Sequence, residues 1–128
     1  MIRGWGAPLR AWALCAALLA QHPGAARAHA IILESEPAAG AKLAEPPTGI
    51  YLRFNSKIEK RLSHVTLTAA DGRPVPVAVK ADGSEKPDRI MLRLGSLRHG
   101  AYVVRYKVLA ADGHITEGAL RFTVLEPK

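Results

Sequence analysis

The chain has 128 residues, of which 48% are hydrophobic, and a formal net charge of +7 at pH 7. Its lysines and arginines are spread along the chain, with neither a basic run nor an aromatic stacking platform, so the composition argues against a nucleic-acid partner. The sequence contains no nucleophile elbow and no glycine-rich phosphate loop, which removes most of the support for a hydrolase or a nucleotide-dependent enzyme.

The first 28 residues are predicted to be a cleaved secretory signal. Arginines precede the apolar run AWALCAALLA at 11–20, which is too short to span a bilayer, and the segment ends in the small-residue pattern Ala26-Arg27-Ala28. Cleavage after Ala28 would leave one exported domain, residues 29–128, which we expect in the periplasm. Three arginines and Cys15 leave with the signal, so the net charge falls from +7 to +4 and the domain has no cysteine for a disulfide or a metal.

The remaining sequence predicts an all-β domain. Turn-forming residues such as DGRP and DGH separate its apolar runs, and about seven short strands at this spacing indicate a small antiparallel Greek-key β-sandwich of the Ig-like kind. The pattern Leu97-x-x-Gly100-x-Tyr102 adds a tyrosine that we expect to close a Greek-key corner. Four runs alternate apolar and polar residues with the period of a half-buried strand: TGIYLRF at 48–54, VTLT at 65–68, YVVRYKV at 102–108 and ALRFTV at 119–124.

Four histidines remain after cleavage, and one of them, His114, stands two residues after Asp112. In extended backbone these two side chains project to the same side and could direct an oxygen and a nitrogen at one point. The alternative is an ordinary Asp-Gly hairpin turn with an exposed histidine. His64 alternates with core-facing residues and His99 precedes a strand, so we expect both to be exposed rather than to bind metal.

The fourth histidine, His29, would become the first residue of the exported domain. A terminal amine has a pKa near 8, and with the imidazole Nδ1 of the same residue it can close a chelate ring on a metal. Adding Asp112 and His114 gives three nitrogens and one oxygen, a set that suits Cu(II). Zinc would accept the same groups as a tetrahedron, so the ligand types leave the metal open. The alternative for His29 is a loose first residue without a function.

Three segments resemble the CopC family of periplasmic copper-binding proteins: HAIILESEPAAGA at 29–41, LRF at 52–54 and ADGHITEGALRFTV at 111–124. Members of that family typically begin with His-Ala after cleavage and carry Asp-Gly-His near the C-terminus. The resemblance covers essentially the whole exported domain. It implies a cupredoxin-like β-sandwich that binds one Cu(II) ion through the amine and imidazole of His29, with Asp112 and His114.

Two features depart from the family pattern. Some CopC members supply a further glutamate ligand shortly after the phenylalanine of the second strand, where this chain has Asn55, Ser56 and Lys57. Glu59 follows later and is expected to be a surface charge. Other members hold a Cu(I) site in a methionine-rich loop, but the exported domain contains only Met91, which we expect to pack in the core. We therefore expect no Cu(I) methionine site.

These features predict a copper carrier or buffer in copper resistance or homeostasis, and not an enzyme. By resemblance, its partner could be a CopD-type copper transporter of the inner membrane, encoded as a separate chain, and we expect the domain to be a monomer. Two alternatives remain: a copper oxidase or polysaccharide monooxygenase, which also uses an N-terminal histidine, and a metal-free Ig-like interaction module. The scarcity of aromatic residues and the anionic Asp112, which favours Cu(II) over Cu(I), count against the enzyme.

Overall fold

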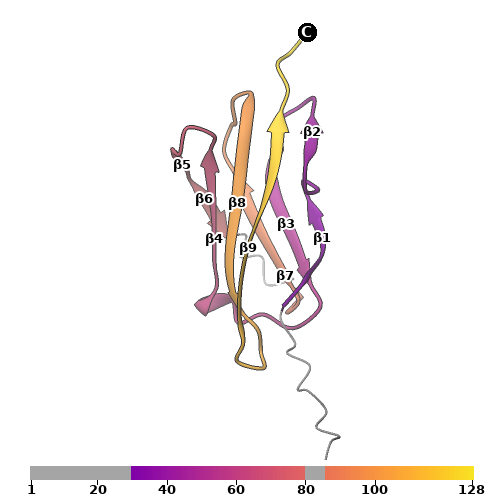
Figure 1. Cartoon of the computed structure of the whole chain (residues 1–128), viewed down its shortest axis with the longest axis vertical. Helices are drawn as coiled ribbons and strands as arrows, with labels where there is room; N and C mark the ends of the chain where they lie inside the picture. Colours follow the sequence, from indigo (N-terminus) through magenta and orange to yellow (C-terminus); the bar gives the residue numbers. More distant parts are fainter. Residues whose placement is uncertain (1–29, 80–85) are drawn as a thin grey trace, which may run out of the picture.

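Two β-sheets pack face to face in the computed structural model, which describes residues 30–79 and 86–128 (Figure 1). The all-β prediction is confirmed. The described residues form nine strands rather than about seven, and three of these strands have only two or three residues each. The elements are β1 Ile32–Glu36, β2 Ala41–Leu43, β3 Gly49–Phe54, the 3-10 helix η1 Lys60–Leu62, β4 His64–Ala69, β5 Pro74–Val75, β6 Val77–Val79, β7 Arg89–Leu94, β8 Gly100–Leu109 and β9 Ile115–Val124.

The first sheet has the strand order β1-β3-β7-β6, and every neighbouring pair in it is antiparallel. The alternation in β3 predicts its faces correctly, since Ile50, Leu52 and Phe54 are at most 2% exposed and the residues between them are half-buried. The edge strand β1 changes register around Leu33, whose side chain is exposed. A bulge of this kind disrupts the regular ladder of an edge strand and so discourages pairing with another chain.

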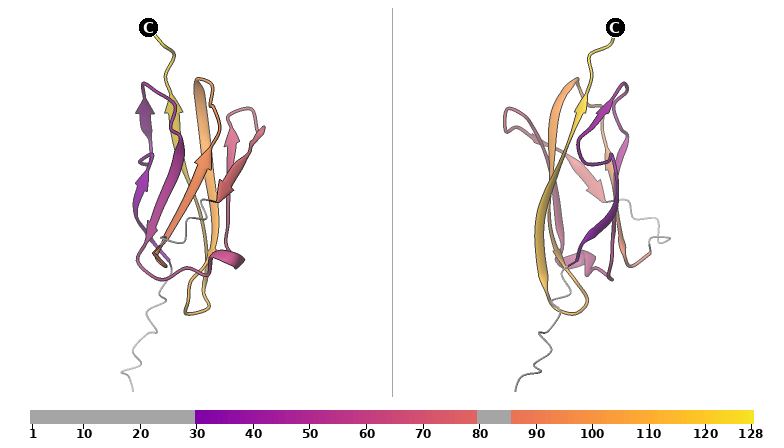
Figure 2. Two further views of the ribbon diagram at one scale, coloured as in Figure 1. Left: turned by 180° about the vertical axis from the view of Figure 1, so that it is seen from behind. Right: turned by 45° about the vertical axis from the view of Figure 1, so that its right-hand side comes forward.

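The second sheet has the strand order β2-β9-β8-β4-β5. Its centre is the hairpin of β8 and β9, each ten residues long. The short strand β2 runs parallel to β9, whereas the sequence led us to expect antiparallel pairing. The right-hand view in Figure 2 shows β8 and β9 in one layer and β1 and β3 in the other.

The hydrophobic core fills the space between the two sheets. The ring of Tyr102 stacks on Phe122 with centroids 5.3 Å apart, and Phe54 meets Tyr106 edge to face at 5.9 Å. The inward-facing residues predicted in the YVVRYKV and ALRFTV runs all pack in this core. The largest fully buried side chains are Phe54, Phe122, Leu52, Leu67, Val104 and Val108.

Met91 does not pack in the core, contrary to the prediction. In β7 its neighbours Ile90 and Leu92 are buried, while Met91 itself is half-buried. Because successive side chains of a strand point to opposite faces, Met91 lies on the outer face of the sheet, at the register position opposite Tyr51.

Tyr102 closes a Greek-key corner, as predicted. Its hydroxyl donates a hydrogen bond of 2.7 Å to the carbonyl oxygen of Arg98, four residues earlier. This bond fixes the loop that leads into β8.

We call this end of the molecule, which also holds the turn between β4 and β5, the corner end. The turn between β8 and β9 lies at the other end, which we call the hairpin end (Figure 1).

Candidate metal site

The turn between β8 and β9 carries the Asp-Gly-His motif. The Ala110 N–H donates to the His114 carbonyl oxygen, and the Gly113 N–H donates to the Ala110 carbonyl oxygen, both at 2.9 Å. Gly113 has a φ of +89°, a left-handed conformation that glycine adopts without the steric cost of a Cβ. A type I turn followed by a left-handed residue is a common three-residue hairpin loop. The predicted Asp-Gly turn is therefore confirmed.

Asp112 and His114 contact each other across this turn. Asp112 Oδ1 accepts a hydrogen bond of 3.1 Å from the backbone N–H of His114, and its Oδ2 lies 3.2 Å from His114 Nδ1. The hydrogen bond from the His114 amide, followed by the contact with the imidazole, lowers the pKa of Asp112 below its ordinary value. The expectation that extended backbone would align the two side chains is wrong, because the left-handed Gly113 folds the turn and brings them together.

The N-terminal segment enters the sandwich beside this turn. Ala30 is only 1% exposed, and its backbone N–H donates a hydrogen bond of 3.1 Å to Oγ1 of Thr116, two residues after His114. Thr116 therefore links the N-terminal segment to β9. The predicted terminal ligand, His29, directly precedes Ala30 and lies outside the described residues.

Asn55 holds the same segment against the first sheet. The Ile31 N–H donates to Asn55 Oδ1 at 2.8 Å, and the Asn55 N–H donates to the Ile31 carbonyl oxygen at 3.0 Å. Asn55 stands where the family resemblance led us to look for a glutamate ligand. Its side chain instead fixes the chain just after the predicted metal-binding terminus. No sequence pattern indicated this contact, because its partners are 24 residues apart.

The other two described histidines are exposed, as predicted. His64 begins β4 and lies opposite Lys107 in the sheet register. His99 lies at the corner end, where its Nε2 is 3.5 Å from Oε1 of Glu126. Glu59 is exposed as well, in agreement with its prediction as a surface charge.

Asp112 and His114 are the predicted ligands that the structure brings together. Within residues 30–79 and 86–128, no cluster of three or more histidine, cysteine, aspartate or glutamate side chains could hold a metal ion. Glu117, which lies on β9 near His114, forms an ion pair with Lys107 at 2.9 Å.

The contact between Asp112 and His114 is compatible with both side chains binding one ion. Ligand atoms lie about 2 Å from a metal in protein sites, which puts two neighbouring donors about 3 Å apart. The distance of 3.2 Å between Oδ2 and Nδ1 agrees with this spacing. The side chains of Asp112 and His114 are 38% and 50% exposed, so an ion can reach them. The lowered pKa of Asp112 keeps its carboxylate in the ionised form that binds metals.

Comparison with known proteins connects this chain to one family. The family model of the CopC domain matches residues 32–125. This chain is also similar to YobA of Escherichia coli strain K12, which is 30% identical over 98 residues, or 76% of this chain and 79% of that protein.

Two solved structures are similar in fold and sequence. The crystal structure of CopC from Methylosinus trichosporium OB3b is 33% identical with a TM-score of 0.69, and the match covers 75% of this chain and 93% of that chain. PcoC, a methionine-rich copper resistance protein from Escherichia coli, is 28% identical with a TM-score of 0.64. This second match covers 77% of the present chain and all of PcoC.

Proposed function

Since the chain belongs to the CopC family, we propose that it is a copper-resistance protein that holds one Cu(II) ion and acts as a carrier or buffer in the periplasm. The proposed ligands are the amine and imidazole of His29, the carboxylate of Asp112 and the imidazole of His114. Three nitrogens and one anionic oxygen suit Cu(II), which also stands above zinc in the order of divalent affinities.

The hydrogen bond from Ala30 to Thr116 is the observation that carries this proposal. Consecutive Cα atoms are about 3.8 Å apart, so residue 29 cannot lie far from Ala30. Thr116 in turn is two residues from His114 on β9. The bond therefore supports a site in which donors from the two ends of the sequence, separated by more than 80 residues, share one ion.

The proposal requires cleavage between Ala28 and His29. Only cleavage there would give His29 the free amine that completes the chelate ring with its own imidazole. The burial of Ala30 supports a folded domain that starts close to this point. Residues 1–28 would then act as a secretory signal that directs the domain, residues 29–128, to the periplasm.

We further propose that the protein holds no Cu(I) site and is not an enzyme. PcoC is described as methionine-rich, whereas this chain has two methionines in all, Met1 and Met91. Thioether sulfur is the ligand that Cu(I) prefers, while the Asp112 carboxylate favours Cu(II) and opposes redox cycling. A carrier of this kind would act as a monomer and pass its ion to a membrane transporter of the CopD type.

The test is to extend the exported protein by one alanine before His29 and compare Cu(II) electron paramagnetic resonance spectra. N-terminal sequencing first establishes where the exported chain begins. We expect the extended form to lose the nitrogen-rich spectrum, because the amine is no longer on the residue that carries the imidazole. The matched control adds one alanine after Lys128, far from the hairpin end, and should leave the spectrum unchanged. An unchanged spectrum in the N-terminal extension would contradict the proposed amine ligand.

Oxygen consumption separates a carrier from a copper oxidase. We expect the copper-loaded protein to consume oxygen with ascorbate no faster than the same concentration of metal-free protein. Sustained turnover would show that the domain is an enzyme. Equilibrium dialysis at neutral pH tests the remaining alternative, since a metal-free interaction module would take up no copper tightly.

A further inference from the structure

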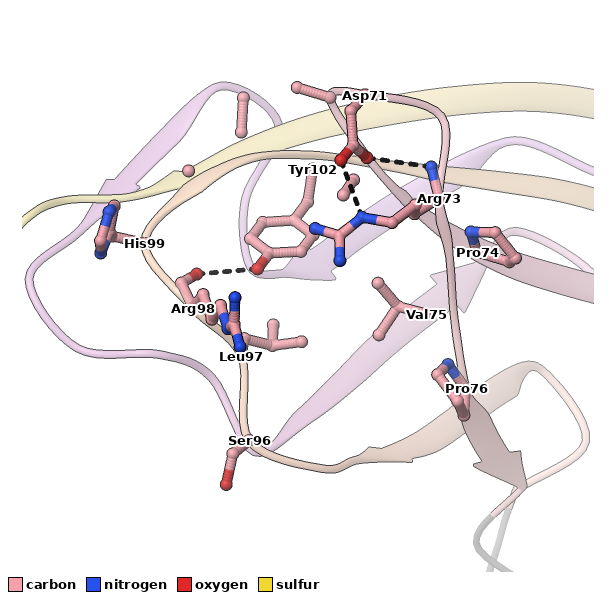
Figure 3. Close-up of a pocket in the computed structure, with 14 residues that line it drawn as sticks. Asp71, Arg73, Pro74, Val75, Pro76, Ser96, Leu97, Arg98, His99 and Tyr102 are labelled. Atoms are coloured by element: carbon pink, nitrogen blue, oxygen red, sulfur yellow. Dashed lines mark hydrogen bonds and ion pairs between the residues drawn. The ribbon is translucent and has the colours of Figure 1, made fainter.

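A cavity of about 390 Å³ lies at the corner end, remote from the candidate metal site. Its walls are the turn between β4 and β5 and the loop that leads into β8. The volume falls within the range of roughly 300–1,000 Å³ that is typical of ligand pockets. Figure 3 shows two arginine side chains, Arg73 and Arg98, projecting over this cavity, with His99 apart from them at its edge.

Arg73 is held in place by its own turn. Asp71 Oδ1 accepts a hydrogen bond of 3.0 Å from the Arg73 N–H, and Asp71 Oδ2 accepts one of 2.7 Å from Arg73 Nε. Gly72, with a φ of +84°, allows the chain to turn between them. Because Nε is occupied by Asp71, the terminal nitrogens of the guanidinium group are the ones that face the cavity (Figure 3).

Arg98 is held through its backbone. Its carbonyl oxygen accepts the corner hydrogen bond from the Tyr102 hydroxyl, which ties this residue to the buried start of β8. In the part of the chain that the structure describes, no side chain pairs with the Arg98 guanidinium. The charged side chains lining the cavity are thus the Asp71 carboxylate and two guanidinium groups, leaving one positive charge in excess.

The floor of the cavity is apolar and partly aromatic. Leu97 and Tyr102 are buried, Val75 is half-buried, and prolines 74 and 76 form part of the wall. A guanidinium group binds a carboxylate through two parallel hydrogen bonds, and an apolar floor binds a hydrocarbon or an aromatic ring. These two kinds of surface meet in the same cavity (Figure 3).

We propose that this cavity is a binding site for a carboxylate attached to an apolar or aromatic group. The carboxylate binds between Arg73 and Arg98, and the apolar group lies on Leu97, Val75 and the Tyr102 ring. One excess positive charge matches one carboxylate. The proposal does not depend on copper, because none of the residues that line the cavity is a proposed metal ligand.

To test this proposal, the metal-free protein is titrated with N-acetylphenylalanine while the chemical shifts of its backbone amides are followed by NMR. We expect saturable shifts at Arg73, Arg98 and their neighbours. N-acetylphenylalaninamide has the same ring without the charge and should bind at least about tenfold more weakly. A peptide that ends in Ala-Ala-Phe, with and without a free C-terminal carboxylate, distinguishes the C-terminus of a protein from a free small acid as the source of the ligand. If the free peptide binds more tightly than N-acetylphenylalanine, the source is the C-terminus of a protein; if it binds no more tightly, the source is a free small acid. In both cases the peptide without the carboxylate should bind more weakly than the free peptide.

The variants are R98A and R98Q, with R93A as the matched control. Arg93 is an exposed arginine on β7 that does not line the cavity. We expect R98A and R98Q to weaken binding of the acid about tenfold or more and R93A to leave it unchanged. Any of three results would overturn the proposal: no saturable shifts, equal binding of the acid and its amide, or an equal loss in R93A. Copper affinity, measured on the same variants, should stay constant, so failure here is distinct from failure of the copper site.

Discussion

The two ends of the sandwich share one core but carry different kinds of functional side chain. At the hairpin end, a carboxylate and an imidazole meet across a three-residue loop, beside an N-terminal segment held by Thr116 and Asn55. At the corner end, two guanidinium groups project over an apolar floor. The ten residues of β8 separate the two ends by about 30 Å of extended strand. At that separation, substitutions at one end should leave the other unaffected.

The largest effect should come from removing the imidazole at the hairpin end. We expect H114A to lower Cu(II) affinity by at least about a hundredfold, because one of the proposed ligands and the contact partner of Asp112 are lost together. Competition with a chelator of known affinity measures this loss. The matched control is H64A, which removes an exposed histidine of β4 and should change little. A small effect of H114A, or an equal effect of H64A, would contradict the proposed site.

Removing the hydroxyl that binds the N-terminal segment should have the next largest effect. We expect T116V to weaken Cu(II) binding about tenfold, because the buried N–H of Ala30 loses its acceptor and the segment that follows the proposed ligand His29 loses a contact with β9. T116S keeps the hydroxyl and should restore most of the affinity. If T116V and T116S bind copper equally well, the segment is positioned by other contacts.

At the corner end, Y102F should lower stability and carboxylate binding without changing copper affinity. Loss of the hydrogen bond to the Arg98 carbonyl should lower the free energy of unfolding by about 1 kcal/mol and the melting temperature by roughly 4–8 °C. Binding of the aromatic carboxylate should weaken, while copper affinity should stay constant. Thermal melts and the two titrations on one preparation test this prediction. A fall in copper affinity would show that the two ends are coupled.

The smallest effect is expected at the ion pair of Lys107 and Glu117 on the outer face of the second sheet. The hydrogen bond from Lys107 to Glu117 raises the pKa of the lysine, so the pair contributes to stability below the ordinary lysine pKa, and this contribution is lost as the pH rises through the raised pKa. Both side chains are more than half exposed, and pairs of this kind contribute little. We expect E117Q to melt within about 2 °C of the unsubstituted protein at pH 7. A larger change would show that the pair supports the nearby turn.

The sequence patterns that predicted the fold correctly are local ones. Alternation placed Ile50, Leu52 and Phe54 in the core, and the spacing of Leu97, Gly100 and Tyr102 predicted the corner bond. The short strands β2, β5 and β6 have too few residues to show a period, and the parallel pairing of β2 with β9 depends on contacts far apart in sequence. Met91 was misplaced because three consecutive apolar residues do not reveal which of them faces inward.

Of the candidate site, the sequence predicted the turn but not its geometry. The Asp-Gly-His motif correctly predicted a turn between β8 and β9, but the side chains of Asp112 and His114 meet through a left-handed glycine rather than through extended backbone. The roles of Thr116 and Asn55 had no sequence signal, because their partners lie 86 and 24 residues away. Contacts of that length arise from the packing of the two sheets, which a local pattern does not encode.

The bond between Ala30 and Thr116 also has a consequence for the order of assembly. It joins the first described residue to the last strand of the second sheet, across 86 positions of the chain. Thr116 lies on β9, so a truncated chain that lacks this last strand cannot form the junction. If the proposed metal site depends on this junction, copper would bind only after folding. A bound ion would then be found only on chains that include β9 and have folded.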